Sequence, residues 1–390
     1  MTKREIGEFL EQYFLEIMNG QRHSTTDKFI RIMLFAFSRV YRRAVQFRHW
    51  IYDKRIFRNK ALGCLVVSIG NLTCGGTGKT PVVEVFAKTL KQKGRKVAIL
   101  SRGYRSRDRS FWEKVKKKFS SKRHEVPPRV VSDGSNLLLN SATAGDEPYM
   151  LASNLKDVVV LVDKDRVKAG LYAISEFEAD ILILDDGFQY LDLKPRINIV
   201  LVDSTMPFHN HHVLPRGLLR EPIKNIRRAD YIFLTKSNGG KHLRHLKTFL
   251  RKHNRRAEII ECCHQPKYLE NVYNKKEHRN LQALKGKKIA ALSGIANPKS
   301  FEDFLEDFDA KIVYSEQFVD HHRYSQQELI NFINKAKNAN ADMVVTTEKD
   351  AVRFPRLFRR DIPIYFMRVE IGIISGQENF DQCISRICFL

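Results

Sequence analysis

A glycine-rich loop near the start of the chain has the residue types that hold a phosphate group. Residues 70–80 read GNLTCGGTGKT and follow an apolar run, 65–69, which predicts a buried strand; a helical pattern over 82–90 comes next. A strand, a glycine-rich turn and a helix form the context in which a P-loop presents backbone N–H groups to phosphate. We therefore expect Lys79 to contact the β- and γ-phosphates of ATP and the Thr80 hydroxyl to bind Mg²⁺.

The loop departs from the common P-loop sequence at two positions. Thr73 stands where the strict pattern has its first glycine, and Cys74 stands where the deviant P-loops of partition and nitrogenase-type ATPases have a lysine. The alternative is a turn that only joins a strand to a helix, but this leaves the Gly-Lys-Thr ending unexplained. The residues expected around the nucleotide phosphates are Thr73, Cys74, Gly75, Gly76, Thr77, Gly78, Lys79 and Thr80.

A second apolar run, 181–184, ends in two acidic residues, Asp185 and Asp186. This pattern resembles a Walker B strand, whose terminal carboxylate positions Mg²⁺ directly or through water. The alternative is a strand followed by an ordinary Asp-Gly turn. Because the same chain has the glycine-rich loop, we favour the magnesium interpretation.

Two further clusters contain the groups that act as general bases. Residues 145–148 read GDEP and precede a helical pattern over 149–155, and residues 320–322 read DHH. A carboxylate paired with an imidazole can deprotonate a hydroxyl nucleophile, so Asp146 and His321 are candidates if the fold brings them together. The alternative is a helix N-cap at Asp146 and histidines that lie on the surface. The histidines within 207–212 are interpreted as part of a solvated loop rather than a metal site, because further ligands at a suitable spacing are missing.

The elements that must position these residues alternate between strand-like and helix-like segments. Near-continuous apolar runs predict an α/β fold, P-loop NTPase-like, with a mostly parallel sheet and flanking helices. Strands are expected at 64–69, 96–101, 158–162, 181–184, 197–202 and 231–235, and a second set at 257–263, 288–292, 311–315, 343–346 and 363–369. Helices are expected at 298–308 and 325–337, and the polar stretch 269–284 is expected to join the two sets. We predict an N-terminal amphipathic helical region over 1–60, a P-loop core over 61–260 and a smaller C-terminal α/β domain with linker strands over 261–390.

The charge balance predicts an anionic partner. The 390 residues have a formal net charge of +24, and 28–60 contain ten lysines and arginines against one acid, interleaved with large apolar residues such as Phe29, Phe37 and Trp50. This composition is typical of a basic amphipathic helix at a membrane surface, although a helix packed on the protein's own core is the alternative. The sequence has no apolar run of about 20 residues and no nucleic-acid-binding motif. Its six cysteines, without a C-x-x-C pair, fit free thiols in a reducing compartment.

Taken together, these segments resemble the tetraacyldisaccharide 4'-kinase family, the lipid A 4'-kinases. The resemblance runs from about residue 35 to residue 369, and the family also lacks the Walker glycine at the position of Thr73. It rests on SIGNLTCGGTGKTP (68–81), SRGY (101–104), GDEP (145–148), DDGFQ (185–189), LREP (219–222), DH (320–321) and TEKD (347–350).

The resemblance implies a reaction and a cellular location. ATP, with Mg²⁺, would phosphorylate the 4'-hydroxyl of a tetraacyl glucosamine disaccharide 1-phosphate and so form lipid IV-A in lipid A (lipopolysaccharide) biosynthesis. The enzyme would act at the cytoplasmic face of a bacterial inner membrane, as a peripheral or monotopic protein, with its anionic surface as a partner. The resemblance implies neither a protein partner nor a nucleic acid.

The resemblance also assigns roles to individual residues. Asp146 matches the base that accepts the sugar hydroxyl proton, and His321 matches its partner. The matches around magnesium are Thr80, Glu147, Asp185 and Asp186. Those near the nucleotide are Lys79, Gln189, Arg220 and Glu221, and Arg166 matches a basic residue expected beside the phosphates or the lipid.

The chain departs from the family pattern at three places. Tyr190 replaces the histidine that usually follows DDGFQ, Asn210-His-His212 replaces a Gly-Asn pair, and residues 107–128 look like a basic insertion.

Two other classes of function stay open on the residues alone. One is a regulatory P-loop NTPase that acts on a protein partner, and the other is a non-catalytic nucleotide- or membrane-binding protein.

Overall fold

The computed structural model describes residues 13–103, 126–295, 297–359 and 361–389. The chain folds into two compact units. The first comprises Met1–Leu100, Asp165–Cys263 and Ile373–Leu390, and the second comprises Ser101–Lys164 and His264–Gly372. Strands β8 (Glu258–Asn271) and β13 (Ile364–Ser375) each continue from one unit into the other. The division expected from the sequence kept 61–260 together and placed 261–390 in one domain. The two divisions differ at 101–164 and at 373–390, and the sequence-based one stays a prediction.

The sheet of the first unit is parallel and buried. Its strands lie in the order β8-β7-β6-β1-β5-β2, and every neighbouring pair is parallel. Apolar side chains fill both faces of these strands, which explains their near-continuous apolar sequences. The strands are β1 (Leu65–Asn71), β2 (Val97–Ser101), β5 (Ile181–Asp185), β6 (Ile197–Asp203), β7 (Tyr231–Thr235) and the first part of β8.

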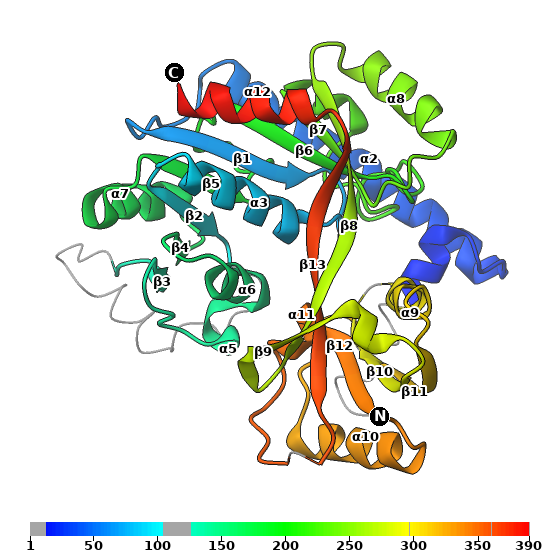
Figure 1. Cartoon of the computed structure of the whole chain (residues 1–390). Coiled ribbons are helices and arrows are strands. Elements are labelled where there is room, and N and C mark those ends of the chain that lie inside the picture. Colours follow the sequence, from blue (N-terminus) through cyan, green and yellow to red (C-terminus); the bar gives the residue numbers. More distant parts are fainter. Residues whose placement is uncertain (1–12, 104–125, 296, 360, 390) are drawn as a thin grey trace. The chain divides into compact units, whose positions relative to one another are not determined.

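Helices cover both faces of this sheet (Figure 1). Phe233 of β7 contacts Phe86 of α3 (Lys79–Gln92) and Phe380 of α12 (Gln377–Cys388). Its neighbours Ile232 and Leu234 instead belong to the core beneath α8 (His242–His253), because successive side chains of a strand point to opposite faces. Tyr41 of α2 (Thr25–Asp53) packs against that second core. The other helices of the unit are α7 (Arg166–Phe177) and the 3₁₀ helix η1 (Ile223–Arg228).

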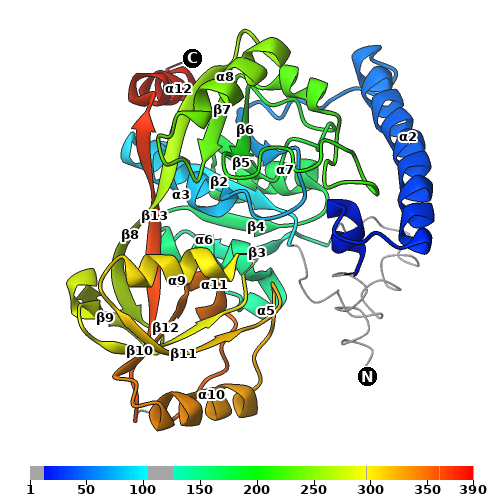
Figure 2. The same ribbon diagram turned by 90° about the vertical axis from the view of Figure 1, so that its right-hand side faces the viewer.

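The second unit has a sheet between two layers of helix. Strands β10 (Lys288–Ser293), β11 (Lys311–Gln317), β12 (Met343–Thr347) and β13 follow the order β11-β10-β12-β13, with parallel neighbours. Figure 2 shows α9 (Pro298–Glu306) and α10 (Gln326–Asn338) on opposite sides of these strands. Each helix has its own apolar core there, one around Phe301 and the other around Phe332.

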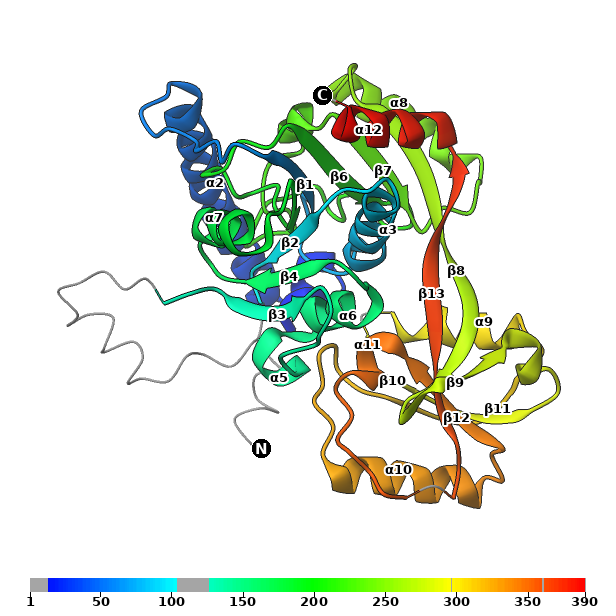
Figure 3. The same ribbon diagram turned by 60° about the vertical axis from the view of Figure 1, so that its left-hand side comes forward.

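The second unit also contains the segment that carries Asp146. An antiparallel pair, β3 (Arg129–Asp133) and β4 (Val159–Val162), lies beside α5 (Ser141–Ala144) and α6 (Asp146–Asn154) (Figure 3). The short helix α11 (Glu348–Ala351) also contacts α6. Asn154, the last residue of α6, donates to the Glu348 carboxylate at the start of α11 at 2.6 Å.

The structure corrects one expectation about the elements. The stretch 269–284, expected only to join two domains, contains the end of β8, strand β9 (Asn274–Asn280) and the 3₁₀ helix η2 (Leu281–Leu284). β9 pairs with β8 in antiparallel register, so this stretch is a hairpin. Most of the basic insertion, 107–128, lies outside the described residues. Within the described ranges, no helix has the length and hydropathy to cross a bilayer.

Candidate active site

The glycine-rich loop leaves the N-terminus of α3 open to an anion. α3 begins at Lys79, and its N-cap Gly78 has a φ of 76° and makes no side-chain capping bond. The first-turn N–H groups of this 14-residue helix therefore point outward with no side-chain cap, as in a phosphate site. Gly75 has a φ of 112°, a conformation that L side chains rarely adopt, so the loop requires glycine there.

Neighbouring strands fix the shape of this loop. The Thr235 hydroxyl donates to the Thr77 carbonyl at 2.8 Å, and the Asn71 amide donates to the Thr77 hydroxyl at 2.9 Å. The Cys74 N–H donates to the Leu218 carbonyl at 2.7 Å. Burial raises the pKa of the Cys74 thiol, so this residue is a neutral packing group at pH 7.

Asp186 forms the centre of an ion-pair cluster beside the loop. Lys79 Nζ lies 3.1 Å from Asp186 Oδ1, and the Arg220 guanidinium binds both carboxylate oxygens at 2.8 Å. Lys79 and Arg220 also contact the Asn71 side chain. Burial alone would raise the pKa of Asp186, but these two cations outweigh it and hold the pKa well below its usual range. The carboxylate is therefore charged at neutral pH, and it holds Lys79 at the head of α3.

The oxygen donors near the loop suit magnesium. Asp185 ends β5, is 5% exposed, and pairs in register with Ile69 of β1 just before the loop. Thr80 is the second residue of α3. In the described part of the chain, no three His, Cys, Asp or Glu residues gather to hold a metal ion. Mg²⁺ is commonly bound by one or two carboxylates together with substrate phosphates. Glu147, the remaining expected ligand, follows Asp146 on α6 in the other unit.

Two of the three residues expected near the nucleotide lie beside the loop, and the third is engaged by its own chain. Gln189 donates to the Asn71 carbonyl at 3.0 Å, and Arg220 belongs to the Asp186 cluster. Glu221 is 2% exposed and accepts hydrogen bonds from Asn225 at 2.8 Å and Arg228 at 2.6 Å, while His49 lies 3.0 Å away. Its nucleotide role stays a prediction.

Tyr190, the departure from the family pattern, supports Arg166. The Arg166 guanidinium lies 5.0 Å from the centre of the Tyr190 ring, and the Tyr190 hydroxyl accepts a hydrogen bond from the Arg166 backbone N–H at 3.1 Å. Arg166 is 6% exposed and begins α7. A tyrosine at this position thus orients a basic residue by stacking and by hydrogen bonding.

The second unit brings Asp146 and His321 together. Asp146 Oδ2 lies 3.3 Å from His321 Nδ1, although the two residues are 175 positions apart in the chain. Asp146 is the first residue of α6 and is 6% exposed, and its N-cap is Gly145, so the side chain does not serve as the cap. His321 has a φ of 68°, an uncommon conformation that often marks a functional constraint.

Two arginines that the sequence did not single out complete this cluster. Arg353 Nε donates to Asp146 Oδ2 at 2.9 Å, and Arg323 Nη2 donates to Asp146 Oδ1 at 3.1 Å. Burial would raise the pKa of Asp146, but the His321 hydrogen bond and the charges of Arg353 and Arg323 outweigh it and lower the pKa. Asp146 is therefore an anion at neutral pH.

Arg353 also ties the cluster to the motif at 347–350. Its side chain is fully buried, and Nη1 donates to Asp350 Oδ1 at 3.2 Å. Lys349 Nζ lies 3.3 Å from His321 Nε2. The sequence signal that pointed here was the TEKD motif, which ends three residues before Arg353.

Comparison with known proteins identifies the family. The family model for tetraacyldisaccharide-1-P 4'-kinase matches residues 30–388. The chain belongs to this family. A tetraacyldisaccharide 4'-kinase of Halothermothrix orenii is 34% identical over 97% of this chain and 98% of its own length. One from Syntrophus aciditrophicus is 37% identical over 90% of this chain and 92% of its own length.

A solved structure of the tetraacyldisaccharide 4'-kinase family has the same fold. It is described as the "apo" form of LpxK from Aquifex aeolicus in complex with ATP. It is 28% identical to this chain, with a TM-score of 0.71, and the match covers 92% of this chain and 100% of the other. The resemblance found in the sequence and the predicted P-loop NTPase-like α/β fold are both confirmed.

Proposed function

We infer that this chain is an ATP-dependent kinase of lipid A biosynthesis that phosphorylates the 4'-hydroxyl of a tetraacyldisaccharide 1-phosphate. The observation that carries this function is the family match over 30–388. The open N-terminus of α3, with Lys79 as its first residue, supports ATP as the phosphate donor, because a kinase must hold a polyphosphate by backbone N–H groups and a cation.

Lys79 and the loop would hold the donor. In the reaction a bond forms between the acceptor oxygen and the γ-phosphorus, and the bond from that phosphorus to the β–γ bridging oxygen breaks to release ADP. Lys79 and the α3 N–H groups would neutralise charge that grows on the phosphate oxygens. Bound Mg²⁺, held through Thr80, Asp185 and Asp186, would neutralise more of that charge. Glu147 is also proposed as a magnesium ligand.

Asp146 is proposed as the base that takes the proton of the acceptor hydroxyl. Its charged state at neutral pH and its contact with His321 support this role. The proton would pass from the hydroxyl to Asp146 and then to His321 or solvent. Arg353 is proposed as a positioning residue, because it binds Asp146 and also contacts His321 Nδ1 at 3.2 Å.

Helix α2 is proposed to bring the enzyme to an anionic membrane, at the cytoplasmic face of the bacterial inner membrane. Its large apolar side chains are unusually exposed: Phe29 is 63% exposed, Ile32 66% and Val40 61%. A soluble protein seldom exposes so many large apolar residues on one helix unless they meet a partner or a membrane. Because the acceptor has four acyl chains, the enzyme would bind it at a membrane surface.

The kinase proposal is tested by supplying labelled ATP, Mg²⁺ and the tetraacyldisaccharide 1-phosphate in detergent micelles. We expect label in the lipid. A regulatory NTPase would release labelled phosphate to water whether or not the acceptor is present, and a non-catalytic binding protein would leave ATP intact. Either result would reject the proposal.

A further inference from the structure

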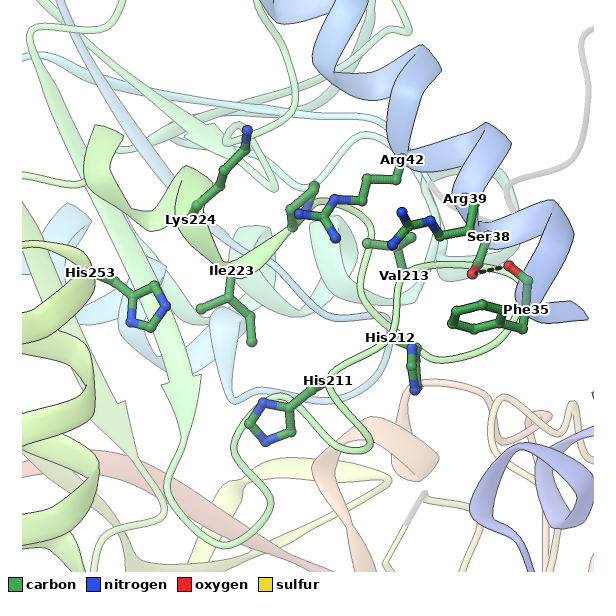
Figure 4. A pocket seen from close by; sticks show the side chains of 11 residues that line it. Phe35, Ser38, Arg39, Arg42, His211, His212, Val213, Ile223, Lys224 and His253 are labelled. Atoms are coloured by element: carbon green, nitrogen blue, oxygen red, sulfur yellow. Dashed lines mark hydrogen bonds between the residues drawn. The ribbon is translucent and has the colours of Figure 1, made fainter.

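A pocket of about 350 Å³ lies in the first unit between α2 and the loop after β6 (Figure 4). We call it the α2 pocket. It is bounded by α2, the loop at 211–213, the start of η1 and the end of α8. Its lining residues are Phe35, Ser38, Arg39, Arg42, His211, His212, Val213, Pro222, Ile223, Lys224 and His253. The residues assigned above to the donor and to the base are all elsewhere.

The α2 pocket is strongly cationic. Arg39, Arg42 and Lys224 line it, and no lining residue is a carboxylate. All three side chains are exposed, and none of them has an ion-pair partner among the residues that the structure describes. Burial and nearby Arg216 lower the pKa of His212, so this ring is neutral at pH 7.

Contacts between α2 and the rest of the first unit also hold the shape of the pocket. Tyr41 donates to the Arg220 carbonyl at 3.0 Å, and Gln46 donates to Asn225 at 3.1 Å, so α2 is fixed on both sides of Arg42. Phe35 contacts the edge of the His212 ring, with 5.7 Å between ring centres. Figure 4 shows the Arg39 and Arg42 side chains reaching from α2 toward Val213 and Ile223. An anion in this pocket is close to two guanidinium groups and to apolar side chains.

The surroundings of the pocket indicate a lipid rather than a soluble anion. Phe35, which lines the pocket, is 44% exposed, and Ile32, three positions before Phe35 and seven before Arg39 and so on the same side of α2, is 66% exposed. A phosphate with acyl chains attached satisfies both the cations and the exposed apolar side chains, whereas inorganic phosphate satisfies only the cations. We propose that the α2 pocket binds the phosphate headgroup of an anionic membrane phospholipid. This inference rests on the proposed membrane contact of α2.

The test compares two double variants of the full chain. Arg39→Gln/Arg42→Gln removes two charges from the pocket, and Arg43→Gln/Lys28→Gln removes two exposed charges from the same helix outside it. Each should lose the general attraction of a basic side chain to an anionic surface, about fivefold per charge. We expect the pocket variant to lose at least a further tenfold in binding to phosphatidylglycerol-containing vesicles, measured by flotation without ATP or acceptor. Equal losses would overturn the proposal.

Further measurements separate the other occupants. The charge-keeping Arg39→Lys/Arg42→Lys variant should bind vesicles within about threefold of the native chain, and a loss equal to that of the glutamine variant would overturn the headgroup site. Calorimetry with short-chain phosphatidylglycerol and with inorganic phosphate should give saturable binding of the lipid only. Equal binding of both would assign the pocket to free phosphate. In phospholipid-free detergent, a raised KM for the acceptor in the glutamine variant would assign it to the acceptor's own phosphate. Because the vesicle assay uses no catalysis, its failure leaves the kinase proposal intact.

Discussion

Asp146 illustrates how single residues set the chemistry of this enzyme. Burial of this carboxylate, which is 6% exposed, raises its pKa, yet His321, Arg353 and Arg323 outweigh burial and keep it charged. The same contacts make it a weaker base, so its contribution depends on position more than on basicity. A charged carboxylate held by a fixed arginine and a histidine is suited to accept a proton from a hydroxyl placed against it.

Replacing Asp146 by asparagine should lower kcat by about 10²–10⁴-fold and leave the KM for ATP nearly unchanged, since general-base catalysis contributes a factor of this size. His321→Gln should act in the same direction. His322→Gln is the matched control, because His322 Nε2 lies 3.3 Å from Glu328 Oε1 and the His322 ring packs against Phe318 and Tyr324. Steady-state kinetics measure the effect, and an unchanged kcat in Asp146→Asn would reject the base.

Arg353→Met should destabilise the protein by about 3–5 kcal/mol at pH 7, because it leaves buried Asp146 and Asp350 without a buried cation. Arg323→Met, whose side chain is 42% exposed, should cost less than about 1 kcal/mol. The contacts of Asp146 lower its pKa in the folded protein below the unfolded value of about 3.9. Their contribution to the free energy of unfolding is therefore complete above about pH 3.9 and is lost as the pH falls through the lower pKa of the folded state. Urea unfolding at pH 7 and pH 3 should show the difference shrinking in acid; a constant difference would contradict the assignment.

Lys79→Met should lower kcat/KM for ATP by at least about 10²-fold, because a fixed cation at the transferring phosphate is lost. The fold should survive, since Asp186 keeps both hydrogen bonds from Arg220. Lys88→Met, an exposed lysine of the same helix, is the control. Equal kcat/KM values for ATP in the two variants would show that Lys79 does not act on the phosphate donor.

At this scale the sequence identified the residues that belong to compact motifs. Lys79, Asp186 and Asp146 each follow a local pattern of glycines or of strand and acid. Arg353 lies outside such a pattern, because its partners Asp146 and His321 come from distant segments that only the fold brings together. For Glu221 the sequence motif was recognised, but the motif did not predict that the carboxylate pairs with His49 and Arg228.

Among the elements, α2 has two distinct sides. One side is bound into the first unit, where Tyr41 and His49 contact the segment at 220–221. The other exposes large apolar residues, with Phe47 and Trp50 stacked 5.7 Å apart. Removing the whole helix would therefore expose a buried carboxylate as well as remove the proposed membrane contact, so substitutions on the exposed side are the better probe.

Phe37→Ser/Val40→Ser should weaken vesicle binding by at least about tenfold, because burying such side chains in lipid contributes about 1–3 kcal/mol each. The melting temperature should stay within a few degrees, since both side chains are more than half exposed. Ala36→Ser, on the same helix, is the control. If vesicle flotation is unchanged by the double substitution, α2 is not the membrane contact.

The elements themselves were predictable where their apolar pattern is strong. Most parallel strands of both units stand out because they are buried on two faces; the edge strand β11 is only partly buried. β9 could not be found in this way, because its sequence NKKEHRN is almost entirely polar and exposed, and only its pairing with β8 makes it a strand.

On the scale of the whole molecule, segments far apart in the sequence build each unit. Residues 101–164 cluster with 264–372, a grouping decided by long-range contacts that local patterns do not encode. By contrast, the net charge of +24 follows directly from the amino-acid composition. It fits an enzyme whose donor, acceptor and proposed membrane surface are all anionic.

The central claim is that ATP consumption by this chain is coupled to phosphorylation of the acceptor lipid. The most direct measurement follows ADP and labelled lipid together, with γ-labelled ATP, Mg²⁺ and increasing amounts of the tetraacyldisaccharide 1-phosphate. We predict one labelled lipid, carrying the new phosphate at the 4' position, for each ADP formed, and negligible ADP without acceptor. ADP that forms at the same rate with and without acceptor, and without label in the lipid, would contradict the account.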